Sequence, residues 1–229
     1  MRSDTATPYT PVSDLGAVRL FDCRNVAERD RGIKAAIEAV GSGDLVVLPT
    51  DTVYGIGADA FKSWSVTNLL NAKGRGRHMP PPVLVGSRHT LDGLVTRMPP
   101  AARDLVEAFW PGALTIIVEQ APTLQWDLGD TGGTVAVRMP LHPVALEVLR
   151  STGPMAVSSA NLTGEPAATT AEQAREQLSY KVSVYLEAGE CPNPVPSTII
   201  DLTGDRPKIV RAGAVSTDQI REVVGEVEQ

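Results

Sequence analysis

The stretch KGRGRHMPP, residues 73–81, gathers three fixed positive charges and a histidine within six residues. Like charges this close repel one another unless an anion lies nearby. The glycines between them allow the backbone to approach a ligand closely, and the prolines behind them stiffen the chain. This pattern favours phosphate binding over its usual alternative, a solvated run of surface charges.

The three cations Lys73, Arg75 and Arg77 are separated by single residues. In an extended loop, side chains at this spacing point to the same side. We therefore expect all three to face one polyanion. We also expect that removing one of them barely affects folding, because the loss relieves repulsion in the ligand-free protein.

Other polar side chains stand beside short apolar strands, where ligands usually bind in α/β sheets. The stretches are PTDTVYG (49–55), VRMP (137–140), SSAN (158–161), PSTII (196–200) and IVRAG (209–213). Arg138 is either a paired structural residue or a planar fork for a carboxylate or phosphate. The polar groups of Ser158 and Asn161 either face a ligand or satisfy their own backbone in a local turn. A nucleophilic serine is disfavoured, because no GxSxG elbow is present.

Several common sites are excluded or disfavoured. No GxxxxGK[ST] loop occurs, and GIGADA (55–60) fits the dinucleotide pattern without a clear helix or a suitably placed acidic residue behind it. The three histidines are scattered, and the two cysteines form no CxxC pair. Neither a protein-ligated metal nor a disulfide framework is indicated.

The composition bounds the class of protein. A chain of 229 residues with 42% hydrophobic residues favours one globular domain. A net charge of −6 argues against a broad basic surface for nucleic acid. No apolar run is long enough to cross a membrane. Residues 1–16 contain no signal-peptide core and predict a flexible arm, so we expect a cytoplasmic protein with its domain over residues 17–229.

Helical and strand patterns alternate along the chain. Capping residues and apolar periodicity predict helices at 25–41, 65–72, 99–110, 142–149, 170–178 and 216–224. Short apolar, mostly β-branched runs predict strands at 45–49, 83–85, 113–118, 134–138, 155–159, 197–200 and 208–211. This mixture favours a single α/β domain with a mixed sheet.

Taken in order, these stretches resemble the YrdC/TsaC family of threonylcarbamoyl-AMP synthases. The matching pieces are PTDTVYGIGADA, KGRGRHMPPPVLV, WPGALTIIV, TVAVRMP, SSANLTG, PSTII and IVRAGAV. The resemblance implies a YrdC-like domain in which a twisted mixed sheet with flanking helices surrounds a concave, positively lined cavity. It implies condensation of L-threonine, bicarbonate or CO2, and ATP to threonylcarbamoyl-AMP and pyrophosphate. A separate transferase complex would move the product to tRNA.

The resemblance also implies roles for particular residues. Lys73 and Arg75 would hold phosphates and carry the catalysis. Further nucleotide contacts would come from Thr134, Ser158, Asn161 and Arg211. Threonine would be held by Thr52, Arg138 and Ser197, the fork of Arg138 being suited to its carboxylate. Mg²⁺ would come with ATP rather than lie in a protein cage.

Two positions depart from the family pattern. Gly76 and Arg77 follow KGR where many relatives have proline, so we expect loss of Arg77 to matter less. Gly86 stands where many relatives have a histidine after the strand, and His89 lies three residues further on. Two alternatives stay open: a YrdC-like module that binds RNA without catalysis, and a paralogue acting on another carbamoyl or adenylate substrate. A weak contact of the enzyme with RNA also stays open. The net charge counts against the RNA module.

Overall fold

Short apolar strands form a ten-stranded mixed sheet in the computed structural model, which describes residues 18–192 and 194–229. The predicted arm over residues 1–16 lies outside the described residues. The strands are β1 (Arg19–Asp22), β2 (Val46–Leu48), β3 (Gly55–Asp59), β4 (Val83–Leu84), β5 (Leu114–Glu119), β6 (Thr134–Arg138), β7 (Met155–Ser159), β8 (Val184–Glu187), β9 (Thr198–Asp201) and β10 (Lys208–Arg211). Their order is β1-β8-β2-β3-β7-β4-β6-β5-β9-β10, with both parallel and antiparallel neighbours.

Five of the helices begin at a side-chain cap or at a proline. The helices are α1 (Val26–Ser42), α2 (Ser63–Lys73), α3 (His89–Asp92), α4 (Pro100–Phe109), α5 (Pro143–Thr152), α6 (Ala171–Leu178), the 3-10 turn η1 (Ser179–Lys181) and α7 (Thr217–Val224). The side chain of Asn25 accepts from the Glu28 amide at the start of α1, and Ser216 with Gln219 forms a full capping box on α7. Within the described residues, no helix is both long and apolar enough to cross a membrane.

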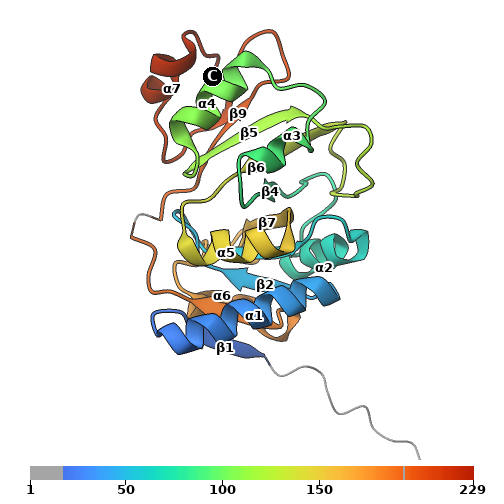
Figure 1. Cartoon of the computed structure of the whole chain (residues 1–229), viewed down its shortest axis with the longest axis vertical. Coiled ribbons are helices and arrows are strands. Elements are labelled where there is room, and N and C mark those ends of the chain that lie inside the picture. Colours follow the sequence, from blue (N-terminus) through green and yellow to red (C-terminus); the bar gives the residue numbers. More distant parts are fainter. Residues whose placement is uncertain (1–17, 193) are drawn as a thin grey trace, which may run out of the picture.

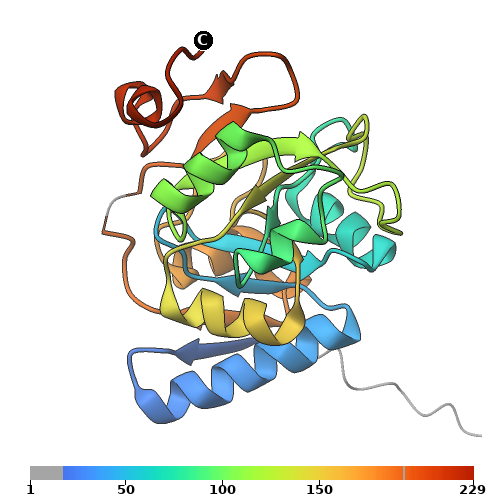
Figure 2. The same ribbon diagram turned by 45° about the horizontal axis from the view of Figure 1, so that its top comes forward.

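Helices cover both faces of the sheet. Val46 and Leu48 of β2 belong to the apolar cluster that contains α1 and α5 residues, whereas Val47 belongs to the cluster with α2 and α6. This division follows from the alternation of side chains along a strand. Figures 1 and 2 show α1 and α5 packed side by side, and α4 and α7 together at the far end of the molecule. The predicted α/β domain with a mixed sheet and flanking helices is confirmed.

The GIGADA pattern forms strand β3 rather than a nucleotide loop. A Cβ atom added at Gly57 would lie 2.6 Å from the Met155 side chain, and one at Gly55 would lie 2.7 Å from Val157. The glycines therefore allow β3 to pack closely against β7. The dinucleotide interpretation is excluded, and β1, β3, β8 and α3 are elements that sequence patterns did not predict.

Gly86 ends the β4 segment against the backbone of α5. An added Cβ would lie 2.7 Å from the Arg150 nitrogen and 2.8 Å from the Leu149 carbonyl carbon. Backbone atoms in a packed helix cannot move aside as a flexible side-chain tip can. The position at which the family resemblance implies a histidine therefore has no room for a side chain in this protein.

We expect Gly86→Ala to lower the free energy of unfolding by about 1–3 kcal/mol, because overpacking forces backbone shifts. Gly41→Ala is the matched control, since Gly41 lies in α1 and an added Cβ meets nothing within 4 Å. That change should be neutral or stabilise by up to about 1 kcal/mol. Urea unfolding of both variants measures the difference, and equal stabilities would contradict the packing argument.

Candidate active site

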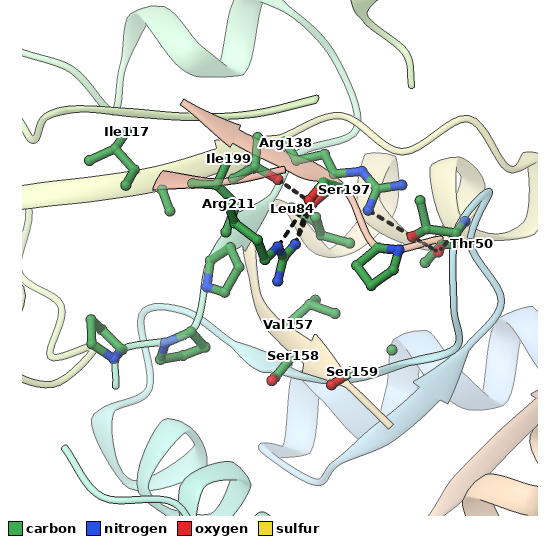
Figure 3. Close-up of a pocket in the computed structure, with 18 of the residues that line it drawn as sticks. Thr50, Leu84, Ile117, Arg138, Val157, Ser158, Ser159, Ser197, Ile199 and Arg211 are labelled. Carbon is green, nitrogen blue, oxygen red and sulfur yellow. Dashed lines mark hydrogen bonds between the residues drawn. The ribbon is translucent and has the colours of Figure 1, made fainter. Parts of the chain in front are cut away.

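One cavity of about 350 Å³ collects most of the predicted site residues, and its size suits a small ligand. Its walls come from β3, β5, β6, β7, β9 and β10 and from the turns beside them, as Figure 3 shows in part. Seven predicted residues line it: Thr52, Arg75, Thr134, Arg138, Ser158, Ser197 and Arg211. Lys73 and Asn161 do not. Among the described residues, none that lines the cavity is acidic, whereas three are arginines.

Arg138 ends β6 and is 6% exposed. Its Nη2 donates to Asp51 Oδ1 at 2.6 Å, its Nη1 to Thr52 Oγ1 at 2.9 Å and its Nε to the Gly112 carbonyl at 2.9 Å. Burial lowers the pKa of Arg138, and the neighbouring carboxylate of Asp51 opposes that shift. Arg138 is thus a paired structural residue that also lines the cavity. Its role as a fork for a carboxylate or phosphate stays a prediction.

The turn after β2 presents its hydroxyl groups to Arg138. Thr50 Oγ1 donates to the Val53 carbonyl at 2.6 Å and accepts from the Thr52 amide at 3.1 Å. The two threonine hydroxyls lie 3.0 Å apart, and Thr52 is 2% exposed. This bonding fixes the turn that carries Thr52, so its hydroxyl reaches the cavity from a defined direction.

Arg211 and Ser197 form one hydrogen-bonded unit in the cavity wall, as the dashed lines in Figure 3 show. The guanidinium donates through Nε and Nη2 to the Ser197 carbonyl at 3.1 and 2.6 Å, and Nη2 also lies 3.0 Å from Ser197 Oγ. Ser197 Oγ in turn lies 2.8 Å from Thr115 Oγ1. The pKa of Arg211 is lowered by burial and by the positive charges of Arg138 and Arg75. The three arginines are therefore close enough for the charges of Arg138 and Arg75 to act on Arg211.

Lys73 is the last residue of α2 rather than a loop residue, and it is 3% exposed. Its Nζ donates to the Ser159 and Asn161 carbonyls at 2.5 and 2.7 Å, with Asn161 Oδ1 at 3.4 Å. Gly74 ends the helix with a φ of 63° and turns the chain before Arg75. The expectation that Lys73 lies in an extended loop is wrong. Its buried hydrogen bonds count against the expectation that its removal barely affects folding.

Arg75 donates through Nη1 to Ser158 Oγ at 2.9 Å. Its Nε is buried without a hydrogen-bond partner among the described residues. Burial lowers the pKa of Arg75. A half-buried guanidinium with an unpaired Nε beside a serine hydroxyl is suited to an anionic ligand.

Arg75 lines the cavity, whereas Arg77, like Lys73, does not. Its side chain forms an ion pair with Asp127 at 2.7 Å and another with Asp130 at 3.6 Å. The expected common direction of the three cations is wrong, because α2 includes Lys73 and two aspartates attract Arg77.

The side chains of Asn161 and Thr134 both form hydrogen bonds to nearby backbone carbonyls. Asn161 Nδ2 donates to the Leu162 and Glu165 carbonyls, both at 2.8 Å, so its amide satisfies a local turn. Thr134 lines the cavity, and its hydroxyl donates to the Thr131 carbonyl at 2.9 Å. His89 is exposed on α3 and is not part of the cavity lining, so it does not substitute for the missing histidine.

Asp51 and Thr115 belong to the site although they were not predicted as site residues. Asp51 also accepts from the Leu141 amide at 2.8 Å, which ties the β2 turn to the segment after β6. The signal for Asp51 was its place between two threonines in PTDTVYG. In the described part of the chain, no cluster of three or more histidine, cysteine or acidic side chains could hold a metal ion.

The fold and the three arginines of the cavity define an α/β protein whose site is suited to a small anionic ligand. A family model for Sua5, YciO and YrdC proteins, described as "Telomere recombination", matches residues 38–213. The chain belongs to this family. It is 62% identical over 90% of its length to a Mycobacterium tuberculosis protein provisionally named a threonylcarbamoyl-AMP synthase, and covers 94% of that protein.

Two further comparisons concern Pyrococcus abyssi. A threonylcarbamoyl-AMP synthase of that organism is 38% identical over 89% of this chain. The crystal structure of P. abyssi Sua5 complexed with L-threonine superposes with a TM-score of 0.86 and 33% identity over 92% of this chain. The chain spans 61% of the first protein and 62% of the second.

We expect pH to separate wild type from Lys73→Met. Burial, and then the charge of Arg75, lowers the pKa of Lys73 from 10.5 to about 8. Between these values the unfolded chain binds the proton more tightly, so the stability contributed by Lys73 rises with pH. The stability of wild type relative to Lys73→Met should therefore increase by about 1–3 kcal/mol from pH 7 to pH 10. Urea unfolding at each pH measures it, and a constant difference would contradict it.

Proposed function

We propose that this protein is a threonylcarbamoyl-AMP synthase that condenses L-threonine, bicarbonate or CO2, and ATP. The observation that carries the proposal is the convergence of Arg75, Arg138 and Arg211 on one cavity without an acidic lining residue in the described chain. Phosphates and a carboxylate are the anions that such forks bind. Names of the M. tuberculosis and P. abyssi relatives, and the threonine complex of P. abyssi Sua5, support this choice.

The phosphate end of the site lies at Arg75. Its Nη1 and the Ser158 hydroxyl are 2.9 Å apart and would contact the same phosphate group. Arg211 faces the same cavity, and Thr134 lies at the edge toward the loop before β6. Lys73 has three hydrogens and three oxygen neighbours, so we assign it, with Asn161, to holding the turn after β7.

The threonine end lies at Arg138. Each of its Nη atoms uses one hydrogen on protein, to Thr52 or Asp51, and keeps a second for the substrate carboxylate. The hydroxyls of Thr52 and Ser197 would pair with the threonine hydroxyl. Asp51 holds the fork in place by its ion pair.

The reaction needs positioning and charge stabilisation more than covalent help. The threonine amine adds to CO2 and loses a proton, which forms a carbamate. A carbamate oxygen attacks the α-phosphorus of ATP, the bond to the bridging oxygen breaks, and pyrophosphate leaves. Arg75 and Arg211 would stabilise negative charge on the phosphate oxygens. This adenylate transfer makes the enzyme a nucleotidyltransferase.

Mg²⁺ would enter with ATP. The described residues offer no cluster of acidic or histidine ligands, and Mg²⁺ usually keeps several waters and binds substrate phosphates. The ion would neutralise part of the triphosphate charge. The product would pass to a tRNA threonylcarbamoyl transferase complex in the cytoplasm.

Incubating the purified protein with ATP, threonine and bicarbonate tests the proposal. Threonine-dependent pyrophosphate release together with formation of the adenylate is the expected result. An RNA-binding module would release no pyrophosphate, and a paralogue would release none that depends on threonine.

We expect valine to replace threonine poorly. Without the substrate hydroxyl, the buried hydroxyls of Thr52 and Ser197 lose a partner. A site built to hydrogen-bond a hydroxyl rejects its absence by factors of up to about 10⁴. Pyrophosphate release is measured with each amino acid at matched concentrations, and equal rates would rule out this assignment.

We expect Arg138→Lys to raise KM for threonine by about tenfold or more while leaving ATP affinity within about twofold. Lysine keeps the charge beside Asp51 but loses the planar fork that fits a carboxylate. Lysine is preferred to alanine, because Arg138→Ala leaves Asp51 with a buried unpaired charge and destabilises the fold. Calorimetry with each substrate gives the two affinities. Reduced ATP affinity with unchanged threonine affinity would contradict the assignment of Arg138 to threonine.

A further inference from the structure

The segment between β5 and β6 is fastened to the segment between α2 and β4 through a single residue, Arg77. Its guanidinium forms two hydrogen bonds to the Asp127 carboxylate, at 3.0 and 2.7 Å, and lies 3.6 Å from Asp130. Figure 1 shows the two connections approaching each other beside α3. Ion pairs of Arg77 with Asp127 and Asp130 therefore connect the two segments beside the cavity.

The backbone of Arg77 makes a second attachment. Its carbonyl accepts from the Asp130 amide at 2.9 Å, and an added Cβ at Gly129 would lie 2.6 Å from that carbonyl oxygen. Gly129 has a φ of 107°, which favours glycine, and its amide donates to Asp127 Oδ1. The loop over residues 127–131 is thus shaped to receive Arg77.

This loop forms part of the cavity wall. Leu128 and Thr131 line the cavity, and the Thr131 carbonyl accepts both the amide and the hydroxyl of Thr134. On the other side of the attachment, Arg75 lies two residues before Arg77. Any shift of the 127–131 loop away from Arg77 would move Thr134 and the nearby wall relative to Arg75.

We propose that Arg77 and Asp127 are positioning residues that set the nucleotide end of the cavity by locking the 127–131 loop against the Arg75 segment. The inference rests on the proposed function for the identity of the ligand, ATP. Neither side chain needs to touch ATP. Arg77 acts through the loop, so its loss should still matter less than the loss of Arg75, but with a defined effect on ATP affinity.

The test measures ATP affinity by calorimetry and KM for ATP and threonine in Arg77→Ala and Asp127→Asn. Both variants should weaken ATP binding, by about two- to fivefold, since an exposed ion pair contributes up to about that factor. Arg77→Ala should have the larger effect, because it also loses Asp130. KM for threonine and kcat should change less than twofold.

The two variants separate positioning from direct electrostatics. Arg77→Ala removes a positive charge and Asp127→Asn removes a negative one, so a purely electrostatic effect on ATP would weaken binding in the first and tighten it in the second. The exchanged pair Arg77→Asp with Asp127→Arg should restore most of the ATP affinity. At about 1 M salt, where screening acts within about 3 Å, wild type and Arg77→Ala should converge.

Arg24→Ala is the matched control, because Arg24 forms a similar exposed ion pair with Asp22 on the edge strand β1. Its ATP affinity should equal that of wild type. Arg75→Ala should lower kcat/KM for ATP by about 10²-fold, which tests the proposed phosphate site separately. If Arg75→Ala behaves so while Arg77→Ala binds ATP normally, or if Asp127→Asn binds it more tightly, the positioning role is overturned and the proposed function stands.

Discussion

Positive charge gathered in one cavity is the constraint around which the site is organised. Arg138 is buried, Arg75 is half-buried and Arg211 is exposed. An arginine removed from water costs several kcal/mol unless hydrogen bonds or an opposite charge compensate it. Arg138 is compensated by Asp51, Thr52 and a backbone carbonyl. Arg211 relies on Ser197, and Arg75 on Ser158. The protein thus holds three cations in place while neutralising only one of them with a carboxylate.

That incomplete compensation is the physical basis of the function proposed for the cavity. The chain carries a net charge of −6, yet the cavity gathers three guanidinium groups and no acidic lining residue in the described chain. The positive potential of the three guanidinium groups favours an anion in the cavity. Because hydrogen bonds already hold these groups in position, they need little rearrangement to bind it. Lys73 does not line the cavity but supports its wall, because its ammonium donates hydrogen bonds to the carbonyls of Ser159, at the end of β7, and Asn161, in the turn that follows.

The sheet order brings these groups together. β3 and β4 both pair with β7, while β6 lies between β4 and β5, and β9 pairs with β5. The turns that follow β2 and β7, the end of β6 and the start of β9 therefore reach one cavity. Thr52 and Ser197 are distant in sequence, yet both line the same cavity.

Local patterns in the sequence determined most of the elements, because caps, helical periodicity and β-branched runs act over a few residues. Asn25 and Ser216 marked helix starts correctly, and seven of the nine predicted site residues line the cavity. Strand β3 escaped prediction, since its glycines are explained only by close packing against β7. Tertiary structure alone decided which charges meet. Asp51 with Arg138, Asp127 with Arg77, and Lys73 with the turn after β7 join residues far apart in the chain. A spacing rule that assumed an extended loop could not anticipate these partners, because helix α2 continues through Lys73 and long-range pairing sets where each side chain lies.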